Sequence, residues 1–111
     1  MADTINYVGN IDLDNRKVLK NKDGSISTEK SISFSPDGIT EILIPTIVDG
    51  KEVSQKQAID AFYKTGEHLG VFNNTDPNFS YDNLEKYAIG IHERQAKHYT
   101  NKYKTNNIKG R

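Results

Sequence analysis

Three Asp-Gly pairs divide the first half of the chain into short segments, and they constrain the fold more than any other feature: Asp23-Gly24, Asp37-Gly38 and Asp49-Gly50. Aspartate and glycine both tolerate the positive φ angles that tight hairpin turns require. Each pair stands between stretches that alternate in polarity or are β-branched, so the first half predicts strands joined by hairpins. The second half shows helical periodicity instead. The chain therefore predicts an α+β fold, with a small antiparallel meander of three to five strands packed against two C-terminal helices.

The clearest strand pattern runs from residue 25 to residue 34. Its apolar or β-branched residues occupy even positions: Ile26, Thr28, Ile32 and Phe34. This period of two predicts one buried face and one solvated face. The solvated face would carry Ser25, Ser27, Ser31, Ser33 and Glu29.

Three other segments are candidates for partner strands. They are residues 5–8, residues 17–20 and, with the strongest pattern, residues 41–48. Pro45 lies within the last of these and cannot donate a ladder hydrogen bond. We therefore expect this strand at an edge of the sheet, or a bend at the proline.

Two helices are predicted in the second half. Ser54 and Gln57 form a capping box at the start of the first, and Gly66 is placed to end it in the left-handed conformation. After an apolar connector and a loop, residues 84–99 carry a second helical stripe. We expect one domain over residues 1–104 and a flexible basic tail over residues 105–111.

The composition excludes several classes of site. The chain has no cysteine, so it forms no disulfide and no thiolate metal site. His92-Glu93 begins a zinc-protease pattern, but the fourth residue after the histidine is Ala96 and the second histidine is missing. No nucleophile, base and orienting group stand in a recognisable pattern. We therefore expect no catalysis, no metal and no cofactor.

One candidate ligand site is a set of hydroxyls beside two cations. Hydroxyl groups with a cation can bind phosphate. A solvated strand face has the same composition, so both interpretations stay open. His68, between a helix end and a connector, is either a further ligand contact or a loop hydrogen-bonding residue. The predicted site consists of Arg16, Ser25, Ser27, Thr28, Lys30, Ser31 and His68.

The C-terminal end interleaves cations with tyrosines, a composition used on single-stranded nucleic acid. A helix C-terminus is also commonly basic because of its dipole. Lys plus Arg and Asp plus Glu number 15 each, and this neutrality weighs against a nucleic-acid-coating protein. The candidate residues are Arg94, Lys97, Tyr99, Lys102, Tyr103 and Lys104.

Short motifs in a fixed order cover residues 7–99. They include Gly9-Asn10-Ile11-Asp12-Leu13, Asn21-Lys22-Asp23-Gly24-Ser25-Ile26-Ser27-Thr28, Ile44-Pro45-Thr46, His68-Leu69-Gly70 and His92-Glu93 with Gln95. As a set, they resemble a small module found in tailed-bacteriophage and prophage proteins, within large virion-associated proteins and as short separate proteins. The resemblance implies phage origin and assigns no activity to individual residues.

These observations rank the candidate functions by the support that the sequence gives each of them. The first is a phage accessory module, virion-associated or host-interacting, that binds a protein without catalysis. The second is an anti-defence inhibitor that binds a bacterial immune protein or sequesters a nucleotide signal, the latter in a pocket expected at an oligomer interface. A nucleic-acid binder and an enzyme follow. The N-terminus lacks a signal-peptide pattern and no apolar run is long enough to cross a membrane, so we expect the host cytoplasm or the virion.

Overall fold

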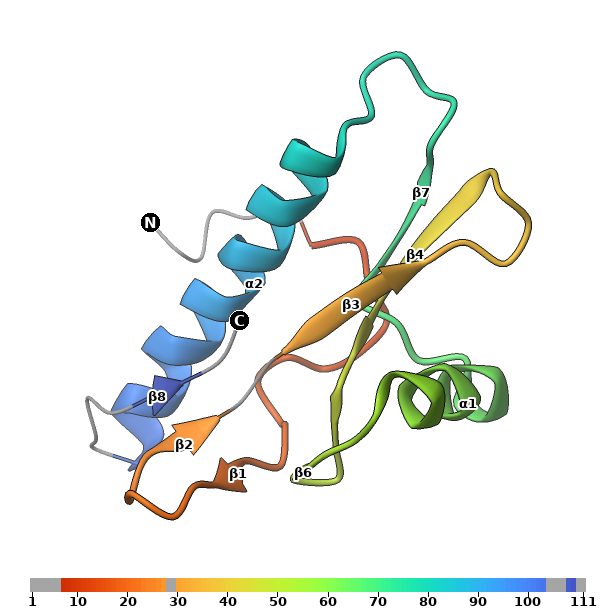
Figure 1. The fold of residues 1–111 in the computed structure, drawn as a ribbon. Helices are drawn as coiled ribbons and strands as arrows, with labels where there is room; N and C mark the ends of the chain where they lie inside the picture. Colours follow the sequence, from red (N-terminus) through yellow and green to blue (C-terminus); the bar gives the residue numbers. More distant parts are fainter. Residues whose placement is uncertain (1–6, 28–29, 104–107, 110–111) are drawn as a thin grey trace.

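The computed structural model describes residues 7–27, 30–103 and 108–109. It confirms an α+β fold with small antiparallel sheets, mostly in the N-terminal half, and two helices (Figure 1). In chain order the elements are β1 (Leu19–Lys20), β2 (Ile26–Ser27), β3 (Ser31–Phe34), β4 (Thr40–Pro45), β5 (Ile47–Val48), β6 (Lys51–Glu52), α1 (Gln55–Thr65), β7 (Gly70–Asn73), α2 (Tyr81–Tyr103) and β8 (Ile108–Lys109).

The strands form three small sheets rather than one meander. Their orders are β1-β2-β8, β3-β4-β7 and β5-β6. The predicted strand over residues 25–34 is therefore wrong as a single element, because β2 and β3 belong to different sheets. The expected partner at residues 17–20 is confirmed for Leu19 and Lys20, which form β1 and pair antiparallel with β2, whereas residues 17 and 18 form no strand. Tyr7 and Val8 form no strand, and the rest of the predicted strand at 5–8 lies outside the described residues.

β4 is the central strand of its sheet, so the predicted edge position is wrong. It pairs with β3 along residues 42–45 and with β7 along residues 40–43. Pro45 is the last residue of β4 and stands beyond the part that pairs with β7. Its missing N–H therefore removes no ladder hydrogen bond. The strand ends at the proline, the backbone bends at Thr46, and β5 begins at Ile47. The alternative prediction, a bend at Pro45, therefore agrees with the structure.

The turn and cap signals act as local chemistry predicts. Asp49 and Gly50 both have positive φ angles, 53° and 77°, in the two-residue turn between β5 and β6. Ser54 and Gln57 form the capping box of α1, with reciprocal distances of 3.1 and 2.9 Å. Gly66 closes the helix at a φ of 76°.

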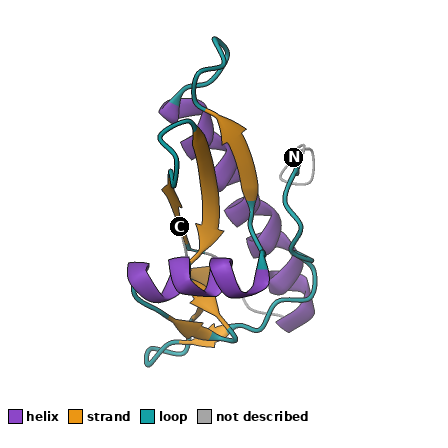
Figure 2. Ribbon diagram, turned by 90° about the vertical axis from the view of Figure 1, so that its right-hand side faces the viewer, coloured by secondary structure: helices purple, strands orange, loops and turns teal. Residues whose placement is uncertain are grey.

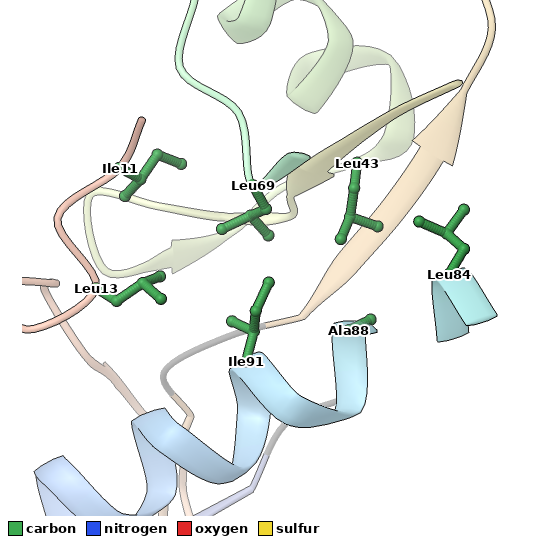
Figure 3. Close-up of a cluster of buried hydrophobic side chains, with 7 residues drawn as sticks. All are labelled: Ile11, Leu13, Leu43, Leu69, Leu84, Ala88 and Ile91. Carbon is green, nitrogen blue, oxygen red and sulfur yellow. The ribbon is translucent and has the colours of Figure 1, made fainter. Parts of the chain in front are cut away.

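The two helices cover opposite faces of the β3-β4-β7 sheet. Alternation along β4 sends Ile42 and Ile44 toward Ala58 of α1, and it sends Leu43 toward α2. Figure 2 shows α1 crossing one end of the strands while α2 runs behind them. The N-terminal segment adds Ile11 and Leu13 to the core on the α2 side. Figure 3 shows the whole cluster: Ile11, Leu13, Leu43, Leu69, Leu84, Ala88 and Ile91.

Two residues of the predicted C-terminal tail belong to a strand. Residues 108–109 form β8, which pairs parallel with β2. The rest of the predicted tail, residues 105–107 and 110–111, lies outside the described residues. Within the described ranges, neither helix has the length and apolar character that a membrane crossing requires.

Candidate functional site

Two serines of the predicted ligand site are buried rather than solvated. Ser25 is 1% exposed and Ser27 is 2% exposed. Asn21 Nδ2 donates to both hydroxyl oxygens at 3.0 Å, and the Ser25 hydroxyl donates to Asp23. The predicted wet face is therefore wrong here, because these hydroxyls stabilise the β1-β2 turn from inside.

The other members of the predicted patch have separate contacts. Arg16 donates a hydrogen bond from its guanidinium to the Ile47 carbonyl at 2.8 Å. It lines a cavity of about 60 Å³ that contains none of the predicted serines, and Asp49 and Glu67 line the same cavity. Lys30 pairs with Glu52 at 3.3 Å. Thr28 lies outside the described residues. The cavity carries two carboxylates beside one guanidinium, so its charge disfavours an anionic ligand.

His68 makes the contacts of a loop residue. Its Nδ1 lies 3.0 Å from the Gly66 carbonyl, and its peptide N–H donates to Asn10 Oδ1 at 2.8 Å. Asn10 Nδ2 also donates to the Gly66 carbonyl at 3.0 Å. The ring packs edge-on against Phe62. These contacts tie the N-terminal segment to the end of α1.

The basic C-terminal residues whose side chains the structure describes lie in different environments. Arg94 donates to the Asp14 carboxylate at 3.2 Å, and the Tyr99 ring is fully buried and cannot stack on a base. Lys97 is exposed. Lys102 and Tyr103 belong to the last turn of α2, and Lys104 lies outside the described residues.

The open edge of β3 is the feature that local patterns did not reveal. Lys30 and Thr46 form a hydrogen-bonded pair, with Thr46 N donating to Lys30 O at 2.7 Å. Antiparallel pairing alternates, so the next two such pairs involve Ile32 and Phe34. The N–H and C=O groups of Ser31 and Ser33 therefore point away from β4. Within the described ranges, no strand pairs with this outer edge.

A groove of about 150 Å³ runs between this edge and α2. The strand side is formed by Ser31, Ile32 and Ser33, and the base is formed by Leu43, Leu84 and Ala88. Tyr81 and Glu85, one turn apart on α2, form the opposite wall.

Tyr81 connects the wall of the groove to a buried carboxylate behind it. The Tyr81 hydroxyl donates to the carboxylate of Glu41 at 3.2 Å, and Glu41 is only 5% exposed. This hydrogen bond and the negative charge of Glu41 raise the pKa of Tyr81 above its usual value of 10.0. No Lys or Arg is among the described residues that line the groove. Sequence reasoning missed this set, although an acid at the start of an apolar strand was a usable signal.

The described residues contain no group of three or more His, Asp or Glu side chains placed to hold a metal ion. No protein-family model matches the chain, and comparison with the curated proteins and with the solved structures finds no significant match.

Proposed function

We propose that this chain is a non-catalytic protein-binding module that takes an extended segment of its partner onto the outer edge of β3. The observation that carries this proposal is the outward direction of the N–H and C=O groups of Ser31 and Ser33 beside the groove. An unpaired edge next to a helix binds extended peptides by strand addition, in which main-chain hydrogen bonds supply affinity and side-chain pockets supply specificity.

The resemblance to modules of tailed bacteriophages supports an accessory role, with a virion or host protein as the partner. On this proposal the protein acts in the host cytoplasm or on the virion. An anti-defence inhibitor that binds a bacterial immune protein would use the same edge. A nucleotide-sequestering inhibitor has less support, because the hydroxyls of Ser25 and Ser27 are bound internally and the cavity at Arg16 carries two carboxylates.

The test uses the full chain and a library of random short peptides. Selected peptides are titrated into the isotope-labelled protein while the backbone amide resonances are recorded. We expect the amides of Ser31 and Ser33 to shift most, because their N–H groups would gain acceptors. Shifts confined to another surface would overturn the proposal, and so would a library that yields no binder.

A proline variant tests the same edge independently. Ser33→Pro removes an outward N–H and spares the ladder to β4, because Ser33 and Leu43 form a non-hydrogen-bonded pair. Ser33→Thr is the matched control, since it keeps the N–H. Strand addition predicts that the proline abolishes binding and that threonine retains it, with both variants folded by circular dichroism. Equal binding by the two variants would contradict the proposal.

A further inference from the structure

We infer that the strand bound at β3 carries an aromatic side chain opposite Ile32, on the side of the sheet that packs against α1. This inference rests on the proposed function and specifies one residue of the partner. The two strand pairings in this sheet, β3 with β4 and β4 with β7, are both antiparallel. The added strand continues the sheet in the same sense, so its register follows from β3 itself.

The backbone of β3 determines which side chain of the partner faces α1. The outward N–H and C=O groups of Ser31 and Ser33 each form a hydrogen-bonded pair with one residue of the added strand. Residues directly opposite each other share a face, so those two partner residues face the groove with the serines. The residue between them stands opposite Ile32, in a non-hydrogen-bonded pair whose side chains lie closest together. Because Ile32 packs in the cluster around Ala58 of α1, this partner residue faces α1.

The surroundings of this position are apolar and accessible. Phe34 packs edge-to-face against Phe62 and Tyr63, with ring centroids 5.7 and 6.1 Å apart. Ile59 stands one helical turn before Tyr63 and therefore shares its side of α1, which the contact with Phe34 places toward β3. Tyr63 is 64% exposed, and Ile32, Phe34 and Ile59 are only partly buried. A side chain opposite Ile32 would bury apolar surface on all four residues.

A ring suits this position better than an aliphatic side chain. Phe34 is the diagonal neighbour of the residue opposite Ile32, and aromatic side chains are long enough to reach across such a diagonal. An aromatic residue also forms a favourable cross-strand pair with a β-branched residue such as Ile32. The rings of Phe34, Phe62 and Tyr63 already pack edge-to-face with one another, and a fourth ring extends that arrangement.

The experiment starts from the library peptides that bind the full chain. We expect them to share one aromatic residue, with nuclear Overhauser contacts from its ring to the Ile32 methyl groups and the Tyr63 ring. Leucine at that position should weaken binding about fivefold, because it loses the ring–ring packing. Alanine should weaken binding about tenfold or more, because most of the buried apolar area is lost as well.

Protein variants locate the ring. Tyr63→Ser should remove most of the preference for phenylalanine over leucine. Val71→Ser is the matched control and should leave the preference unchanged, because Val71 is 46% exposed but lies on β7, across β4 from β3. Tyr63→Glu should make lysine the preferred residue at that peptide position, a new specificity that only a folded variant can display.

The outcomes separate the two proposals. Peptides that lose binding in Ser33→Pro, but bind equally well with phenylalanine, leucine or alanine opposite Ile32, would overturn the inference and leave strand addition intact. Peptides whose binding is indifferent to Ser33→Pro would overturn the proposed function, and the inference with it.

Discussion

Tyr99 holds the backbone of Arg16 at both of its polar groups. The phenolic hydroxyl accepts the Arg16 N–H and donates to the Arg16 carbonyl at 3.1 Å. One turn earlier on α2, the buried Gln95 donates to the Leu13 carbonyl. These two side chains fix the irregular N-terminal segment against the helix, because a buried backbone group without a partner is costly.

Tyr99→Phe should destabilise the protein by about 1–3 kcal/mol, since it leaves the Arg16 backbone groups without these partners. The free energy of unfolding in urea measures the effect. Tyr63→Phe is the control, because that ring is largely exposed and its change should stay within about 0.5 kcal/mol. Equal effects of the two variants would show that the contacts of Tyr99 contribute nothing.

Gly50→Ala should cost more stability than Gly24→Ala. Both glycines have positive φ angles, 77° and 88°, where an added Cβ costs about 1–2 kcal/mol. At Gly50 the new Cβ would also lie 3.0 Å from the Val18 carbonyl oxygen, whereas nothing lies within 4 Å at Gly24. Thermal unfolding of the two variants provides the comparison. A Gly24 variant that is the less stable of the pair would contradict this packing.

Ser54→Ala should lower the free energy of unfolding by about 1 kcal/mol, because it removes the acceptor for the Gln57 N–H in the capping box. Ser54→Asp keeps an acceptor at the same position and should retain most of the stability. Urea titrations of both variants test the cap. If alanine and aspartate behave alike, the hydrogen bond to Gln57 is not stabilising.

Asp37 should make stability depend on acid pH. Hydrogen bonds from the Thr40 N–H, the Ile39 N–H and the Thr40 hydroxyl lower the pKa of its carboxyl below 3.8. A carboxyl with a lowered folded-state pKa stabilises the protein above its unfolded-state pKa, and this contribution disappears as pH falls through the folded-state pKa.

We therefore expect Asp37→Asn to reduce the loss of stability on acidification below the ordinary carboxyl pKa. Thr40→Val, which removes only one of the three donors, should give an intermediate profile. Urea midpoints recorded as a function of pH measure both. A profile for Asp37→Asn that matches the original protein would exclude this carboxylate as a source of the acid sensitivity.

Part of the candidate site was visible in the sequence. Ser31 belongs to the predicted ligand set, and it does line the groove beside the β3 edge. The same alternation placed Ser25 and Ser27 on a wet face, where the prediction failed. A two-residue periodicity identifies the residues that share a face of the strand. It does not identify the face that another segment of the chain will cover. Here the turn between β1 and β2 places Asn21 and Asp23 beside these serines. Asn21 donates hydrogen bonds to both hydroxyls, and Asp23 accepts one from Ser25.

The sequence by itself determined the α+β class, the Asp49-Gly50 turn and the Ser54–Gln57 cap, because each depends on residues within a few positions of one another. Only the tertiary structure decided that β4 is central and that β7 joins it from beyond α1. It also decided that β3 keeps an open edge beside Tyr81 and Glu85. Strand pairing depends on burial and on backbone hydrogen bonds between segments that are distant in the sequence. Local periodicity therefore does not predict which strands pair.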